Sequence, residues 1–123
     1  MSVVCIRGAI TVNENTKDEI LNKTEILLKE INKLNNISND NIISIIFTMT
    51  KDLNKVYPAV AARNIGIVQA GLLCHQELDI EGSIEKCIRV MYTCEVDFKQ
   101  KDVKHIYLDG AKFLRPDIVN LKG

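Results

Sequence analysis

The sequence predicts an α+β protein in which one mixed sheet carries one long and one short helix on a single face. Apolar, β-branched runs recur along the chain, and only two helical patterns separate them. Several of these runs are apolar at consecutive positions, which is typical of strands buried on both faces. The chain has 123 residues, the length of one ordinary domain, so residues 1–123 are expected to form a single domain.

The first strand and the long helix have the clearest signals. Residues 3–12 are mostly apolar and β-branched, which predicts a buried strand. Thr16 precedes Glu19 by three positions, the pattern of a capping box at a helix start. The helix is expected over residues 17–34, because apolar residues or threonine then recur at helical spacing: Ile20, Leu21, Thr24, Leu27, Leu28, Ile31 and Leu34.

The remaining elements are predicted from shorter patterns. Pro58 suits the first turn of a short helix, which the following alanine-rich residues favour. Gly82 marks a turn, and Pro116 is expected to end the last run. The other β-rich runs are residues 42–50, 68–74, 86–96 and 104–114. A chain this small can bury the second face of its sheet by forming an oligomer.

Composition excludes several classes of protein. The 16 basic and 16 acidic residues cancel, whereas nucleic-acid-binding modules normally have a basic excess. The first residues show neither a basic leader nor a long apolar run, so no secretion signal and no membrane span are expected. The four cysteines fit no common zinc spacing, which predicts no metal site. Reduced cysteines and a cytoplasmic location are therefore expected.

The positions of the arginines are the most informative feature. The chain has four, Arg7, Arg63, Arg89 and Arg115, and two of them interrupt apolar strands: Arg7 in VVCIRGAITV and Arg89 in CIRVMYT. A buried guanidinium without a partner costs several kcal/mol and cannot lose its proton. An ion pair, for example of Arg7 with Glu77, or an edge arginine that reaches solvent would explain one such residue. Two of them favour a ligand that carries carboxylates, which the planar guanidinium binds in bidentate fashion.

Three further residues are weaker candidates. Tyr107 in HIYLDG could be an ordinary core tyrosine, Glu77 a solvated loop acid, and Cys74 a small buried residue. No convincing pair of a nucleophile and a base is found, since His75 and Cys74 would point to opposite faces of a strand. The expected chemistry is therefore electrostatic: fixed cations stabilise charge that develops in a transition state and hold the substrate in a reactive conformer.

Motifs spread from residue 3 to residue 117 carry a resemblance to a known family. They are IRGAITV, TKDEIL, VYPAVAAR, CHQELDI, KCIRVMYT and HIYLDGAKFLRPD. With them the chain resembles the monofunctional chorismate mutases of the AroH class. The resemblance implies a chorismate-mutase-like sheet of ferredoxin-like form, three of which assemble into a trimeric pseudo-α/β barrel. It also implies the intramolecular Claisen rearrangement of chorismate to prephenate, a step towards phenylalanine and tyrosine, with no metal and no cofactor.

The resemblance also implies roles for individual residues. Arg89 matches the cation that contacts the breaking ether oxygen, Arg7 a carboxylate-binding arginine, and Tyr107 a nearby hydroxyl donor. Glu77 and Cys74 match groups that engage the ring hydroxyl of the substrate, and Leu73 lies on the same wall. Positions that line the site from a neighbouring subunit are Tyr57, Ala59 and Arg63. The C-terminal segment that closes over the site contains Leu114 and Arg115.

Two other functions compete with this prediction. Trimeric deaminases of 2-imino acids have a similar pseudo-barrel shape and hold a carboxylate with one arginine, but they would not require both Arg89 and Glu77. The same arginines could also bind the carboxylates of an effector in a non-catalytic amino-acid-sensing module. Such modules are usually fused to an enzyme, which makes this the weakest of the three hypotheses.

Overall fold

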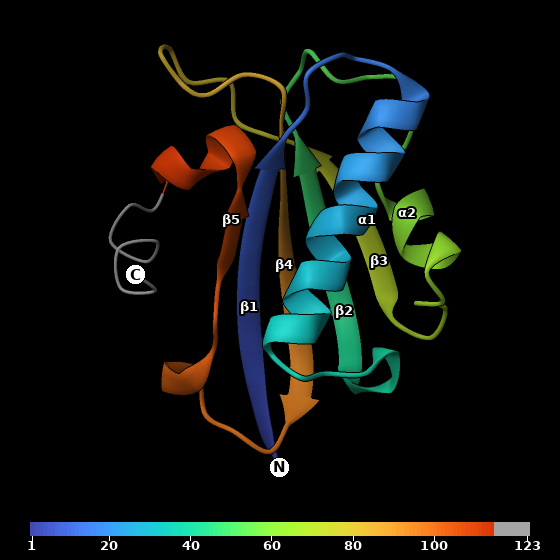
Figure 1. The fold of residues 1–123 in the computed structure, drawn as a ribbon, viewed down its shortest axis with the longest axis vertical. Helices are drawn as coiled ribbons and strands as arrows, with labels where there is room; N and C mark the ends of the chain where they lie inside the picture. The colour runs from blue at the N-terminus through green and yellow to red at the C-terminus, as the bar shows by residue number, and fades with distance from the viewer. Residues whose placement is uncertain (115–123) are drawn as a thin grey trace.

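The structure, a computed structural model that describes residues 1–114, is a five-stranded sheet with helices on one face (Figure 1). The strands are β1 (Ser2–Thr11), β2 (Ile42–Met49), β3 (Gly71–Gln76), β4 (Cys87–Val96) and β5 (Ile106–Leu108). The helices are α1 (Lys17–Leu34) and α2 (Ala59–Asn64), and 3-10 turns lie at Asn39–Asn41, Gln100–Asp102 and Asp109–Leu114. The predicted α+β class is confirmed.

The order of the strands is β3-β2-β4-β1-β5, so the sheet is mixed. The central pairs β1·β4 and β2·β4 are antiparallel, whereas the outer pairs β1·β5 and β2·β3 are parallel. The long helix α1 crosses the front of the sheet, and both edge strands are the ones that pair in parallel (Figure 1). The three longest strands therefore form the antiparallel centre, and residues distant in sequence meet there.

Helix α1 begins and ends at the predicted residues. The Thr16 hydroxyl accepts a hydrogen bond from the backbone N–H of Glu19 at 3.2 Å, which satisfies one of the unpaired donors of the first turn. The reciprocal half of the expected capping box differs, because the Glu19 carboxylate accepts from the backbone N–H of Asn13 at 3.2 Å. The buried stripe of the helix consists of Ile20, Thr24, Leu27, Leu28 and Ile31.

The close packing of α1 on β1 depends on Gly8. A Cβ atom at this position would lie 2.8 Å from Ile31 Cδ1 and 3.0 Å from the Ile106 carbonyl oxygen. Because the carbonyl belongs to the backbone of the neighbouring strand, it cannot move aside as a flexible side chain could. Glycine beside Arg7 thus lets the helix approach the strand that carries the arginine.

Two predicted runs differ from the observed elements. The run over residues 104–114 forms only the three residues of β5 and then a 3-10 turn, because Asp109 adopts a φ of 53°, which is incompatible with a strand. The backbone N–H of Gly110 then donates to the Thr11 hydroxyl at 2.9 Å. The strand expected at residues 68–74 begins later, at Gly71, and extends to Gln76.

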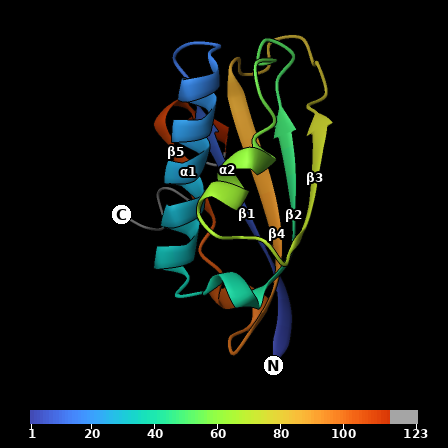
Figure 2. The same ribbon diagram turned by 90° about the vertical axis from the view of Figure 1, so that its right-hand side faces the viewer.

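The two faces of the sheet have different environments. Both helices lie on one face, and no helix within residues 1–114 covers the other (Figure 2). On the helical face Ile6, Phe47 and Tyr92 are fully buried, whereas Leu73 and Met91 on the opposite face are exposed. This open face contains the apolar residues that made the strands look buried on both sides.

Candidate active site

The open face carries a hollow of about 270 Å³ over strands β1, β2 and β4, lined in part by both strand arginines. Strand register explains why they meet. Arg89 pairs with Ala9, and Met91 pairs with Arg7. Paired residues point to the same face, and diagonal neighbours in such a ladder have Cβ atoms about 7 Å apart. Two guanidinium groups therefore originate from adjacent strands at a separation that suits a ligand with two anionic groups.

Glu77 forms an ion pair with Arg89 across this hollow. Glu77 Oε1 lies 3.0 Å from Arg89 Nε and accepts a hydrogen bond from the Thr48 hydroxyl at 2.7 Å. Register brings these groups together, because Thr48 pairs with Arg89 and the backbone N–H of Glu77 donates to the Met49 carbonyl at 2.8 Å. The Nε–H group of Arg89 is not aligned for a hydrogen bond to the Glu77 carboxylate, so the contact is chiefly electrostatic.

The ion pair leaves much of Arg89 accessible. The side chain of Arg89 is 42% exposed and that of Glu77 22% exposed. A guanidinium has five N–H donors, and Glu77 is the only described residue that forms an ion pair with it. The remaining donors can bind an anionic or polar ligand in the hollow.

Arg7 is exposed on β1 and forms no ion pair with any described residue. The sequence left open whether Arg7 forms an ion pair with Glu77. In the structure Glu77 forms its ion pair with Arg89 instead. No described carboxylate therefore compensates the positive charge of Arg7 at the wall of the hollow. An anionic ligand would neutralise it.

A small apolar cluster supports the edge of the hollow. Tyr107, Ala9, Cys87 and Ala111 are buried together, and Leu114 packs against them. Burial raises the pKa of the Cys87 thiol to about 11, although nearby Arg89 opposes the shift. Cys87 is therefore a neutral thiol at physiological pH and is unsuited to nucleophilic attack.

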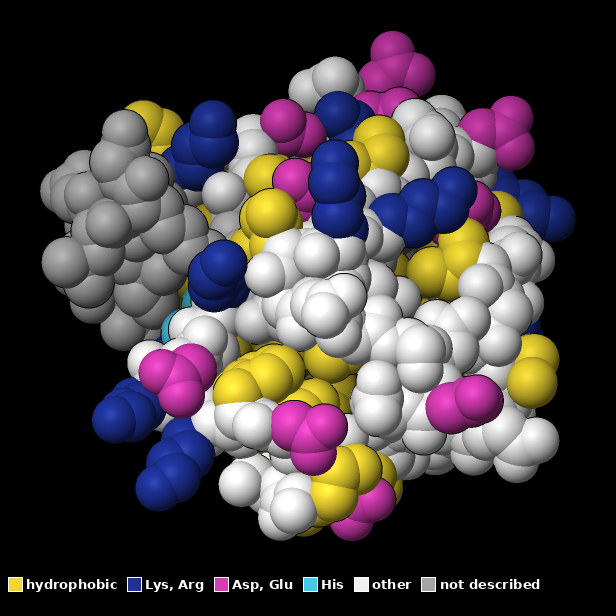
Figure 3. Space-filling view, turned by 60° about the horizontal axis from the view of Figure 1, so that its bottom comes forward, with side chains coloured by type: hydrophobic (Ala, Val, Ile, Leu, Met, Phe, Trp, Pro, Cys, Tyr) yellow, Lys and Arg dark blue, Asp and Glu magenta, His cyan; other side chains and the backbone are white. Residues whose placement is uncertain are grey.

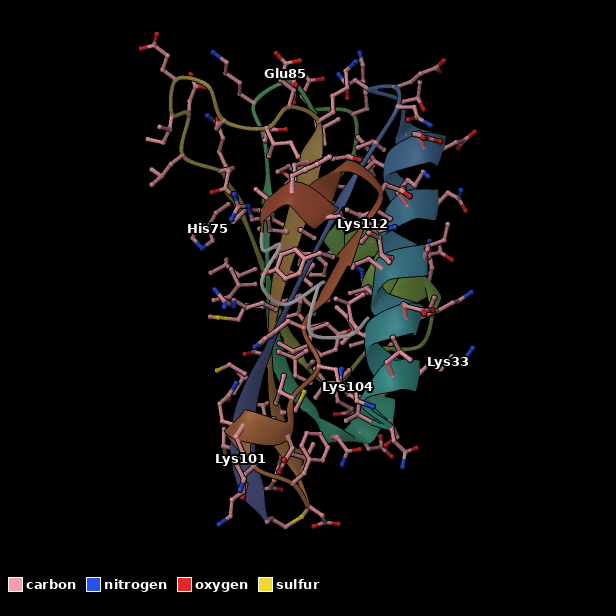
Figure 4. All side chains as sticks on the ribbon, turned by 60° about the vertical axis from the view of Figure 1, so that its left-hand side comes forward. Lys33, His75, Glu85, Lys101, Lys104 and Lys112 are labelled. Carbon is pink, nitrogen blue, oxygen red and sulfur yellow. The ribbon has the colours of Figure 1, made fainter. Side chains whose placement is uncertain are left out.

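Tyr57 and Cys74 line a different hollow, of about 240 Å³. Cys74 pairs with Phe47 on the helical side of the sheet, whereas Arg7 and Arg89 emerge on the open side. His75, the next residue, lies on the side away from the helices (Figure 4), as the alternation of a strand requires. Within one chain the predicted site residues are therefore divided between two places.

The remaining predicted site residues do not line the hollow that contains Arg7 and Arg89. Ala59 is buried in the main core, and Arg63 is exposed on α2. Leu73 is 55% exposed on the open face, three strands from Arg7 and thus about 14 Å away. Arg115, like Pro116, lies outside the described residues.

Thr48 lines the hollow, and the sequence did not identify it as a candidate. Its hydroxyl donates to the carboxylate of Glu77. The only signal was a polar residue within the apolar run of β2, and threonine is common in strands. Only the register of β2 against β4 shows that it neighbours Arg89.

Other kinds of site find little support in the part of the chain that is described. No group of three or more histidine, cysteine or acidic side chains in residues 1–114 is arranged to hold a metal ion. None of the helices within that range is long and apolar enough to cross a membrane. Basic and acidic side chains are intermixed on the face drawn in space-filling form (Figure 3), so this face has no extended basic surface of the kind that binds nucleic acid.

The geometry defines a class of protein: a small α+β protein whose open sheet face has a hollow lined in part by two arginines. Comparison with known proteins then identifies the family. Residues 3–118 match the family model described as chorismate mutase type I. The chain belongs to this family and is an isomerase.

Individual relatives agree with the family match. Chorismate mutase AroH of Bacillus subtilis (strain 168) is 40% identical over 119 residues, which cover 96% of this chain and 94% of that protein. Chorismate mutase AroH of Thermus thermophilus is 42% identical over 114 residues, covering 92% and 93% of the two chains. The structure of a chorismate mutase from Clostridium thermocellum superposes with a TM-score of 0.87 at 54% identity, over 89% of this chain and 97% of that one. These matches leave the imine-deaminase alternative without support.

Proposed function

We propose that the protein converts chorismate to prephenate in the hollow lined by Arg7, Glu77, Arg89 and Tyr107. The observation that carries the proposal is the diagonal placement of the two arginines on β1 and β4. Chorismate carries two carboxylates, and Arg7, which forms no ion pair with a described residue, suits one of them. The free donors of Arg89 suit the ether oxygen.

The reaction needs no proton transfer and no nucleophile. One carbon–oxygen bond of the substrate breaks while a carbon–carbon bond forms, and negative charge gathers on the ether oxygen. Arg89 would stabilise this charge, because a fixed cation is most effective where charge develops in a partly dry site. Glu77 would accept a hydrogen bond from the ring hydroxyl, and the arginines together would hold the substrate in its reactive conformer.

The complete site would form between subunits of a homotrimer. The division of the predicted residues supports this, because Tyr57 and Cys74 lie at a separate hollow of the same chain. A neighbouring copy would bring its own Tyr57, Cys74, Arg63 and Leu73 to the arginines. The exposed apolar residues of the open face, Leu73 and Met91 among them, would then be buried between subunits.

Arg7→Ala tests the role of the hollow. We expect the KM for chorismate to rise by about tenfold or more, since a charged hydrogen bond contributes about 1.5–3 kcal/mol. The assay is the loss of chorismate absorbance. An unchanged KM would refute the role of Arg7.

Dilution tests the assembly. Activity per subunit should fall as the protein is diluted below the dissociation constant of the trimer, with the oligomeric state followed by light scattering. Full activity of a proven monomer would refute the shared site.

A cytoplasmic location is also proposed, because all four cysteines are free, as is usual in a reducing compartment.

A further inference from the structure

The outer edge of β1 is completed by side chains where its neighbour β5 is too short. Strand β5 pairs only with Gly8–Ile10. The preceding outward-directed backbone groups of β1 belong to Cys5 and Arg7. On this side of β1, opposite β4, no strand of the described residues pairs with these positions, and an unpaired backbone group costs about as much as a lost hydrogen bond.

Gln100 and His105 supply the missing partners. The Gln100 carboxamide accepts from the Cys5 N–H at 2.8 Å and donates to the Cys5 carbonyl at 2.7 Å. His105 Nδ1 accepts from the backbone N–H of Arg7 at 2.9 Å. An imidazole nitrogen accepts only when it carries no proton, so Nδ1 is the unprotonated nitrogen in this contact. These three bonds take the place of a strand on both sides of Ile6.

The segment that bears these side chains is itself fixed. The buried amide of Asn35, which follows α1, accepts from the backbone N–H of Lys104 at 2.8 Å and donates to its carbonyl at 2.9 Å. Figure 4 shows Lys104 beside the end of α1 and Lys101 further away, on the turn before it. His105 therefore projects from a backbone held between the end of α1 and the edge of β1.

We infer that His105 and Gln100 are positioning residues for Arg7, holding its main chain so that the guanidinium reaches the ligand from a fixed origin. The inference rests on the proposed role of Arg7 in substrate binding. Small displacements of a binding group can cost large factors in activity. Neither residue lines the hollow, and the hydrogen bond from the Arg7 backbone N–H to His105 Nδ1 connects His105 to a residue that does.

Three variants test the inference. His105→Ala removes the acceptor, whereas His105→Asn keeps an oxygen near the position of Nδ1. We expect the alanine variant to raise the KM for chorismate about tenfold with a smaller change in kcat, and the asparagine variant to restore KM to within about threefold. Gln100→Ala should raise KM about threefold. This variant also answers the question if His105→Ala folds poorly.

A matched control separates positioning from general stability. Asn41 donates to the Glu95 carbonyl at 3.2 Å at the far end of β4, so Asn41→Ala also removes a side-chain bond to the backbone of the sheet. We expect it to lower the melting temperature while leaving KM unchanged. If Asn41→Ala raised KM as much as His105→Ala at an equal loss of stability, the positioning role would be refuted.

A double-mutant cycle with Arg7→Ala distinguishes failure of this inference from failure of the proposed function. If His105 acts through Arg7, His105→Ala should change kcat/KM by less than about twofold once Arg7 is alanine. An equal loss in both backgrounds would overturn the inference while leaving the role of Arg7 intact. Wild-type KM for Arg7→Ala alone would overturn the role of Arg7, and with it the inference.

Discussion

Replacing Arg89 with lysine keeps the charge on β4 but removes the planar guanidinium. In the structure Arg89 Nε lies 3.0 Å from Glu77 Oε1. Glu77 thus contacts the guanidinium at Nε, and the two terminal nitrogens can bind a ligand. A lysine ammonium is a single compact centre. It cannot stay beside Glu77 and also reach an oxygen on the far side of the hollow.

We therefore expect Arg89→Lys to lower kcat by about 10²–10³, the effect of removing one preorganised donor worth about 3–4 kcal/mol. The measurement is chorismate consumption at saturating substrate, with circular dichroism to show that the fold is retained. Citrulline at position 89 keeps the shape and loses the charge, and it should be slower still. A kcat within about tenfold of the wild type for the lysine variant, or a citrulline variant faster than the lysine one, would refute the reasoning.

Three further predictions concern the supports of the site. Thr48→Val removes the 2.7 Å hydrogen bond to Glu77 and should lower kcat/KM about threefold to tenfold; equal steady-state kinetics would contradict this. Gly8→Ala should lower the free energy of unfolding by about 1–3 kcal/mol, measured by urea denaturation, because the added Cβ would lie 3.0 Å from a backbone carbonyl. Burial raises the pKa of Cys87 from 9.0 to about 11, so above pH 9 the unfolded chain loses this proton before the folded chain does. Stability should fall towards pH 11 by at most about 1.4 kcal/mol per pH unit for this group, and Cys87→Ala should make the fall less steep.

Local patterns predicted most of the elements. The boundaries of α1 followed from Thr16 and the apolar stripe, since helix capping and amphipathicity are properties of neighbouring residues. The run after Lys104 was predicted less well. Asp109 adopts a left-handed conformation, and the next residue, Gly110, donates a hydrogen bond to Thr11, 99 positions away. No local sequence pattern predicts either feature.

The partner of Arg89 shows the same limit within the site. The sequence showed that a guanidinium in an apolar strand needs an acceptor, and neither arginine-bearing strand offers one in phase. Glu77 comes from the end of β3, two strands away in the sheet order. Glu77 lies beside Arg89 only because β2 pairs with both β3 and β4 in the observed registers.

The sequence by itself determined the kinds of element, their order and the presence of two arginines in apolar strands, because propensity, periodicity and charge are carried by each residue and its neighbours. The tertiary structure alone decided that Arg7 and Arg89 are diagonal neighbours, that Glu77 pairs with Arg89 rather than Arg7, and that Cys74 points to the opposite face. The physical reason is strand register: a shift by one residue moves every side chain of a strand to the other face. Register is set by the packing of the whole sheet against its helices.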